Sequence, residues 1–145
     1  MNLVCCQYAF DSADYQAALS LRTRILRDPL GLKFDPEELK LESNAYHFGV
    51  FADDKIVGTL MLVETDDNET LRMRQVAVEA NLQGGGVGSM LVKYVEGFAR
   101  REGFTCIRLH ARDTAIPFYL SLGYEKVGDI FFEVTIPHQE MVKNL

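Results

Sequence analysis

Residues 83–88, Gln-Gly-Gly-Gly-Val-Gly, are the part of the sequence best suited to hold a ligand. Four of the six are glycines, which adopt positive φ easily and let the backbone come close to a bound molecule. Apolar residues at helical spacing begin at Val87, so the loop opens a helix whose free amides and positive dipole end favour an anion. Phosphate is the anion that this arrangement predicts.

Two common classes of phosphate-binding loop do not fit these residues. A Walker loop ends in Gly-Lys-Ser/Thr, but Gly88-Ser89-Met90 contains no lysine. A dinucleotide-binding loop needs G-x-G-x-x-G, and Ser89 stands where the third glycine should be. A glycine-rich turn that only lets a strand and a helix pack would not need four glycines.

Two motifs in order resemble the GNAT N-acetyltransferase superfamily. The first, Gln83-x-x-Gly86-x-Gly88, matches its Q/R-x-x-G-x-G/A signature. The second, residues 115–124 (Ala-Ile-Pro-Phe-Tyr-x-x-x-Gly-Tyr), is similar to its A-x-x-F-Y-x-x-x-G-F/Y segment. Residues 74–78 look like the cofactor-binding strand of that family. Residues 109–112 and 136–138 resemble the ElaA-like subgroup.

The resemblance implies acetyl-CoA as a co-substrate. The pantetheine arm would lie along the strand before the loop, where a bulge would splay that strand from the one at 104–111 and open a slot. The amides of the loop would hold the pyrophosphate. The expected cofactor-binding residues are Val76, Ala77, Val78, Gln83, Gly84, Gly85, Gly86, Val87, Gly88, Ser89, Phe118 and Tyr119. No metal site is expected, because no spacing of Cys and His suggests one.

Acetyl transfer to an amine requires a proton for the departing thiolate and a route for the proton of the amine. Tyr119 matches the family tyrosine that serves the thiolate. Glu133 is the residue that we name as the base. His110 and Glu64 on predicted strands, and His138 in the C-terminal tail, are alternatives, and a water relay would need no dedicated residue.

Two further positions bear on the mechanism. Cys106 could carry the acetyl group in a ping-pong reaction, but no obvious neighbour activates it, so direct transfer through a ternary complex is expected. Arg112 stands where many relatives carry an asparagine that contacts pantetheine, and that role cannot be carried over.

The resulting hypothesis is an acetyl-CoA-dependent N-acetyltransferase, an acyltransferase acting on a small-molecule or peptide amine. The alternative is a non-catalytic acyl-CoA-binding sensor or interaction module on the same fold, because a fold does not fix an activity. A nucleotide-binding switch is a third option. The sequence does not identify the amine.

Composition is compatible with this hypothesis. The chain has 145 residues, 48% of them apolar, which suits a single domain over residues 1–145. The net charge of −6 argues against nucleic acid as a partner. No apolar run is long enough for a membrane span, and three cysteines, two of them adjacent, make a poor disulfide framework. We therefore expect a soluble, cytoplasmic protein, with exposed strand edges near the C-terminus that could pair two subunits.

The periodicity of apolar residues predicts a mixed α/β fold. Expected strands cover residues 4–10, 46–51, 56–63, 71–78, 104–111, 124–127 and 130–136. Helices are expected after the capping residues 11–14, from Val87 to the arginines at 100–101, and over 115–122, with a short helical piece at 36–41. Turns are expected at 52–55 and at Gly128-Asp129. A helix between residues 78 and 104 implies a parallel crossover, and the GNAT resemblance implies a centrally splayed sheet of about six or seven strands flanked by helices.

Overall fold

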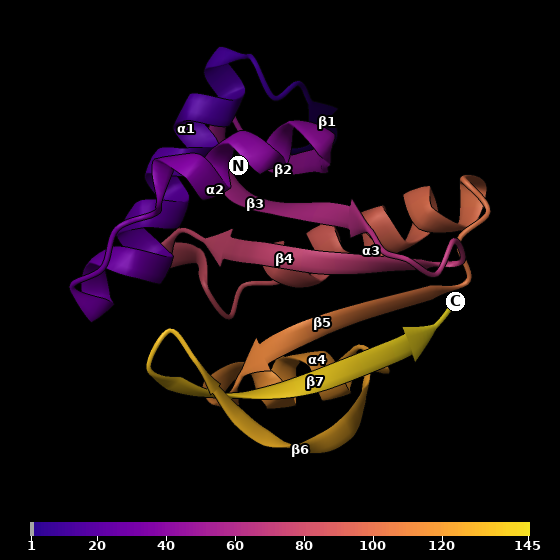
Figure 1. Ribbon diagram of the computed structural model, residues 1–145. Helices are drawn as coiled ribbons and strands as arrows, with labels where there is room; N and C mark the ends of the chain where they lie inside the picture. Colours follow the sequence, from indigo (N-terminus) through magenta and orange to yellow (C-terminus); the bar gives the residue numbers. More distant parts are fainter. Residues whose placement is uncertain (1) are drawn as a thin grey trace. The chain divides into compact units, whose positions relative to one another are not determined.

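The computed structural model describes residues 2–145, and its strands form one seven-stranded sheet in the order β1-β2-β3-β4-β5-β7-β6 (Figure 1). The strands are β1 (Leu3–Tyr8), β2 (Tyr46–Ala52), β3 (Lys55–Glu64), β4 (Thr70–Val78), β5 (Cys106–Arg112), β6 (Glu125–Glu133) and β7 (Ile136–Asn144). β4 runs parallel to β5, whereas β1–β2, β2–β3, β5–β7 and β6–β7 are antiparallel pairs. The predicted mixed α/β class is therefore confirmed.

The helices supply the rest of the regular structure. The α-helices of residues 2–145 are α1 (Ala13–Arg22), α2 (Pro36–Lys40), α3 (Val87–Arg101) and α4 (Ile116–Ser121). Short π and 3₁₀ turns adjoin them: η1 (Thr23–Arg27), η2 (Asp28–Leu30), η3 (Leu41–Asn44), η4 (Ala80–Leu82) and η5 (Asp113–Ala115). Within residues 2–145, no helix is both long enough and apolar enough to cross a membrane.

The chain divides into two compact units. The first unit holds the chain up to Val63 together with Gln75–Val95. The second holds Glu64–Arg74 and Glu96–Leu145.

Local sequence explains the first helix and the first hairpin of the first unit. Ser12 caps α1, because its hydroxyl accepts a hydrogen bond from the Tyr15 amide at 3.2 Å. Asp53 and Asp54 both adopt positive φ, at 48° and 70°, in the two-residue turn between β2 and β3. Aspartate tolerates this region better than most residues, and such turns match the twist of paired strands. The turn predicted at 52–55 is confirmed.

A buried ion pair in the first unit explains an arginine that interrupts the apolar stripe of α1. Arg22 donates two hydrogen bonds to the carboxylate of Glu42, at 2.7 and 2.8 Å. The two side chains are only 3% and 9% exposed. Tyr15 donates a third hydrogen bond to Glu42 at 2.7 Å, and the guanidinium of Arg22 lies over the ring of Phe34. The pair joins α1 to the segment that follows α2.

The C-terminal hairpin of the second unit differs from the sequence-based expectation. We predicted two strands around a turn at Gly128-Asp129, but β6 continues through these residues and the turn lies at Val134-Thr135, with φ of 46° and 67°. β7 then extends to Asn144, over residues expected to form a tail. The prediction was wrong because glycine at 128 serves a bulge instead of a turn.

Pairing with β7 accounts for this bulge. The register between β6 and β7 shifts between Val127 and Phe131, and Gly128 has φ of 71°. The side-chain amide of Gln139 donates to the carbonyls of Val127 and Gly128 at 2.8 and 3.0 Å. These bonds satisfy carbonyl groups that the bulge removes from the ladder.

Candidate functional site

The glycine loop of the first unit takes the backbone form that its residues allow. Gly84 and Gly86 have φ of 82° and 92°, where a side chain would be strained, although no atom lies within 4 Å of the Cβ positions. The carbonyl of Gly86 accepts the Met90 amide at 2.9 Å, which makes Gly86 the residue that caps α3. The amides of Gly86, Val87, Gly88 and Ser89 consequently have no acceptor within the helix.

Contacts to neighbouring strands hold this loop in place within the first unit. The Gln83 side-chain amide donates to the carbonyl of Val78, the last residue of β4, at 3.0 Å. The Glu79 amide donates to the Val57 carbonyl at 2.9 Å. A Cβ on Gly58 would lie 3.2 Å from Cγ1 of Val87, so the glycine in β3 makes room for the first residue of α3. Gln83 thus has an anchoring contact that sequence reasoning did not foresee.

The strand that precedes the loop changes its backbone conformation before the three predicted pantetheine-binding residues. Gln75 has φ of 58°, a rare conformation for a non-glycine residue in a strand. The parallel register with β5 runs from Thr70↔Cys106 to Met73↔Leu109. Ala77 is buried, while Val76 and Val78 are partly buried. The irregular residue lies directly before residues 76–78, the stretch in which the family resemblance implied a bulge.

In the second unit, Tyr119 lies on α4 with its ring buried among aromatic neighbours. It is 5% exposed, and its ring centroid lies 4.9 Å from that of Phe118 and 5.7 Å from that of Tyr124. Burial raises the pKa of the Tyr119 phenol well above its usual value. The hydroxyl is therefore protonated at neutral pH.

A buried charged network holds the end of α4. Lys143 Nζ donates to the Leu122 carbonyl at 2.7 Å and to both oxygens of Glu96 at 3.1 and 3.2 Å. The Tyr124 hydroxyl donates to Glu96 at 2.8 Å. β7 and α3 thereby support the short helix that carries Tyr119.

The second unit brings three of the four candidate bases into one cluster. His110 Nδ1 lies 2.9 Å from Glu133 Oε2, and the ring of Phe131 lies against His110 at 4.8 Å and against His138 at 6.0 Å. His138 is on β7, not in a tail, and its Nδ1 lies 2.9 Å from the Ile136 carbonyl oxygen. The fourth candidate, Glu64, is exposed at the end of β3.

Arg72 completes this cluster, and the sequence did not single it out. Its Nη2 lies 2.5 Å from His110 Nδ1 and 3.3 Å from His110 Nε2. Burial opposes ionisation of Glu133, but the hydrogen bond and charge of His110, with the charges of His138 and Arg72, outweigh it. The pKa of Glu133 is therefore lower than usual, and the group is a carboxylate at neutral pH. The only sequence signal was that Arg72 and His110 lie on strands joined by a parallel crossover.

Two other expectations concern positions outside this cluster. Arg112, at the family asparagine position, ends β5 opposite His138 in the register, and partial burial lowers its pKa. Cys106 is a free, partly buried thiol. Within residues 2–145, no group of three His, Cys, Asp or Glu side chains is arranged to hold a metal ion.

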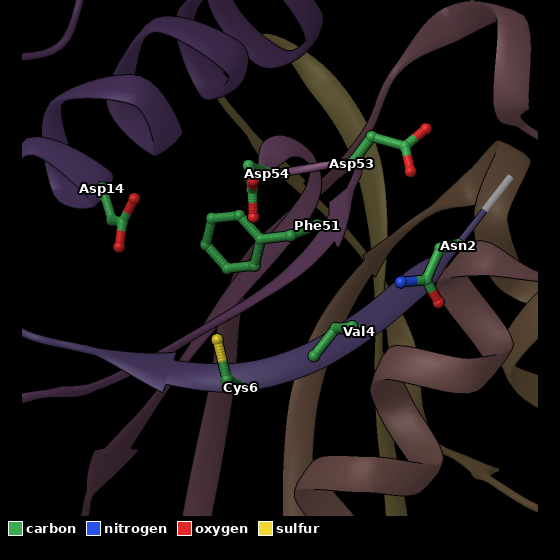
Figure 2. A pocket seen from close by; sticks show the side chains of 7 residues that line it. All are labelled: Asn2, Val4, Cys6, Asp14, Phe51, Asp53 and Asp54. Atoms are coloured by element: carbon green, nitrogen blue, oxygen red, sulfur yellow. The ribbon is translucent and has the colours of Figure 1, made fainter.

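A separate pocket lies in the first unit, at the end of the β1–β2 pair. Cys6, Asp14 and Phe51 line it, and Figure 2 shows their side chains. Asn2, Val4, Asp53 and Asp54 complete its lining. None of the residues predicted to bind cofactor or to act in catalysis belongs to it.

Comparison with known proteins gives a family match over most of the chain. The sequence model described as the acetyltransferase (GNAT) family matches residues 14–124. An uncharacterized acetyltransferase of Streptococcus pyogenes is 29% identical over 113 residues, covering 78% of this chain and 75% of that protein.

Solved structures give the same fold. A putative N-acetyltransferase of Lactobacillus plantarum superposes with a TM-score of 0.87 at 24% identity, over 100% of this chain and 99% of that one. Escherichia coli ElaA superposes with a TM-score of 0.82 at 21% identity, over 98% and 99% of the two chains. At these identities the likeness concerns the fold alone.

Proposed function

Because the chain belongs to the GNAT family of acetyltransferases, we propose that it transfers the acetyl group of acetyl-CoA to the nitrogen of an amine. The acceptor would be a small molecule or a peptide. Transfer would be direct, within a ternary complex, and without an acetylated enzyme.

The conformation of the glycine loop is the observation that carries this proposal. Two glycines with positive φ lead into a 15-residue helix, so the amides of Gly86, Val87, Gly88 and Ser89, which have no acceptor within the helix, can turn toward one anion. These amides would hold the pyrophosphate of CoA, and Gly84 and Gly85 would let the backbone before them approach it closely, with the Gly85 amide bonded to the Leu82 carbonyl at 3.2 Å. Gln83 would fix the loop by its bond to Val78.

We propose that the backbone of Val76, Ala77 and Val78 binds the pantetheine arm. The left-handed residue at Gln75 supports this, since an irregular strand directs backbone groups away from its ladder. An amide near Val76 would also polarise the thioester carbonyl, as oxyanion-hole donors do. Phe118 would contribute apolar contact to the cofactor.

Tyr119 and Glu133 are the residues that we propose for proton transfer. A tyrosine phenol is protonated at neutral pH, and burial raises the pKa of Tyr119 further, so Tyr119 holds a proton that it can donate to the departing CoA sulfur. Glu133 is ionised and partly exposed, so it can support removal of the proton from the amine.

Thermal unfolding with acetyl-CoA, followed by an assay of thiol release, tests this function. Saturating acetyl-CoA at a hundred times its Kd should stabilise the protein by about 2.7 kcal/mol. Thiol release should then be measured with a polyamine, an arylamine, an aminoglycoside and a peptide with a free amino terminus. Binding without thiol release from any amine would favour the non-catalytic acyl-CoA sensor, and no binding would refute both.

Gly86→Val gives a matched test of the loop. Valine at a positive φ costs on the order of 1–3 kcal/mol of strain, and it should also remove the stabilisation by acetyl-CoA. Gly31→Val is the control, because Gly31 has φ of 68° and open space around it but lies outside the loop. It should lose similar stability and keep the full response to acetyl-CoA.

A further inference from the structure

Three strands of the second unit bring an imidazole, a carboxylate and a guanidinium together. His110 is on β5, Glu133 is on β6, and Arg72 belongs to the part of β4 that pairs with β5. The parallel register between β4 and β5 ends at Leu109, and His110 is the next residue of β5. The side chains of His110 and Glu133 are 26% and 40% exposed, so both can be reached from solvent.

The carboxylate decides which nitrogen of His110 carries the proton. Ionised Glu133 can only accept, so Nδ1 at 2.9 Å must donate to it. Nδ1 then cannot also accept from Arg72, although Arg72 Nη2 lies 2.5 Å away. The same Nη2 lies 3.3 Å from Nε2, too far for a strong hydrogen bond, so the single lone pair of Nε2 stays available for a proton. The neutral ring thus presents Nε2 as a proton acceptor.

We infer that Nε2 of His110 accepts the proton of the attacking amine, and that Glu133 and Arg72 are positioning residues which act through His110. This inference rests on the proposed acetyl transfer and refines the role of Glu133 within it. The arrangement is that of a base oriented by a third group, with the His110 ring also packed in a T-shaped contact against Phe131.

Chemistry favours His110 over Glu133 as the direct acceptor. A general base works best when its pKa lies near the working pH. The pKa of Glu133 is lowered by His110, His138 and Arg72 despite the opposing effect of burial, so this carboxylate is a weak base. Histidine is the side chain that most often serves as a general base in enzymes.

The two charged groups next to His110 favour opposite protonation states of its ring. Glu133 stabilises the imidazolium that forms when the proton arrives, whereas Arg72 opposes it and favours the neutral ring before reaction. On the β7 side, Glu140 faces His110 in the register but bonds Arg108 at 3.3 Å, and His138 lies beyond Phe131. Glu133 and Arg72 are therefore the charged groups whose removal should affect His110 directly.

The proton and electron balance of the step is complete with these residues. The lone pair of the neutral amine forms the C–N bond to the acetyl carbon, and the C–S bond breaks with its electron pair on sulfur. His110 Nε2 takes the proton of the nitrogen, and Tyr119 gives a proton to the sulfur. His110 then releases its proton to solvent, and Tyr119 regains one from solvent.

Steady-state thiol release across pH, with the fastest amine of the panel, tests the assignment. His110→Gln should lower kcat by about 10²–10⁴-fold and leave the KM for acetyl-CoA unchanged, because one base contributes that much. Glu133→Gln should lower kcat and move the acid limb of the profile to lower pH, since it removes an anion that favours protonation. Arg72→Met should move the same limb to higher pH, since it removes a cation.

Opposite shifts in these two variants would not follow from a merely structural role. If wild-type protein turns over an amine but His110→Gln retains its kcat, the inference fails while the transferase proposal survives. If wild-type protein releases no thiol with any amine, the transferase proposal fails and the inference fails with it.

The tautomer gives a second readout that needs no amine. Nitrogen NMR of the imidazoles in the full chain should show His110 protonated at Nδ1 at high pH, and Glu133→Gln should shift the proton toward Nε2. A His110 ring protonated at Nε2 in the wild type would overturn the inference, even if His110→Gln were poorly folded.

Discussion

Glu42→Gln tests whether the first unit depends on the ion pair buried between α1 and the segment after α2. The Arg22 and Glu42 side chains are 3% and 9% exposed, and their two hydrogen bonds are 2.7 and 2.8 Å long. Removal of one partner of such a pair leaves a buried charge without compensation and typically costs about 3–5 kcal/mol. Glutamine retains one acceptor for Arg22 or Tyr15, so we expect the lower end, about 3 kcal/mol.

The expected change in melting temperature follows from the size of the chain. For 145 residues the unfolding entropy is roughly 0.3 kcal/mol/K, so this loss corresponds to about 10 °C. Circular dichroism melts and urea titrations of the two proteins at pH 7 would measure it. The slope of the urea transition should stay the same, since the surface exposed on unfolding does not change.

Two variants control this experiment. Glu37→Gln removes the exposed pair with Lys40, whose side chains are 78% and 72% exposed, and should change the melting temperature by less than about 2 °C. Arg22→Met combined with Glu42→Leu removes both charges and should recover part of the loss. A Glu42→Gln protein as stable as the Glu37→Gln protein would refute the argument from buried charge.

Three further predictions use other contacts. First, acidification should reduce the free energy of unfolding in two stages. Burial and the charge of Arg22 lower the folded-state pKa of His47 below 6.5, despite the opposing hydrogen bond to Glu42. The free energy of unfolding should therefore fall as the pH drops below about 6.5, because the unfolded chain binds the proton more readily. In urea titrations, His47→Gln should remove this stage. Arg22 and Tyr15 hold the folded-state pKa of Glu42 below 4.5 against the effect of burial, so a second loss should begin below about pH 4.5. Second, Gly58→Val should cost about 1–3 kcal/mol in a melt, because its side chain would overlap Val87, and Val87→Ala should relieve part of that cost in the double variant. Third, Tyr119→Phe should lower kcat for thiol release while the stabilisation by acetyl-CoA persists; an unchanged kcat would exclude its role as the proton donor.

The glycine loop and the helix after it could be predicted from sequence because both depend on neighbours in the chain. Gly84 and Gly86 are the residue type that positive φ requires, and the apolar spacing from Val87 onward fixes which side of α3 is buried. The family pattern could also name Tyr119, since its motif is contiguous. The cofactor-binding roles of these residues stay predictions for the experiments above.

Other features needed partners that are distant in sequence. Gly128-Asp129 has the composition of a turn, yet the hydrogen bonds from Gln139 make it a bulge. The turn is formed instead by two β-branched residues, Val134 and Thr135. The preference of Gly128-Asp129 for a turn is local and small, whereas the pairing of β6 with β7 involves many residues of both strands. The pairing therefore overrides the turn preference. Sequence reading has no access to that pairing.

The same limit applies to the buried charges. The sequence determined that Arg22 interrupts an apolar stripe and that Glu133 and His110 are candidate bases, because residue type and spacing are local. Only the tertiary structure decided that Glu42 neutralises Arg22 and that Arg72 reaches His110. The physical reason is that the energy of a charge depends on what surrounds it, and in a folded chain those surroundings come from strands and helices far apart in sequence.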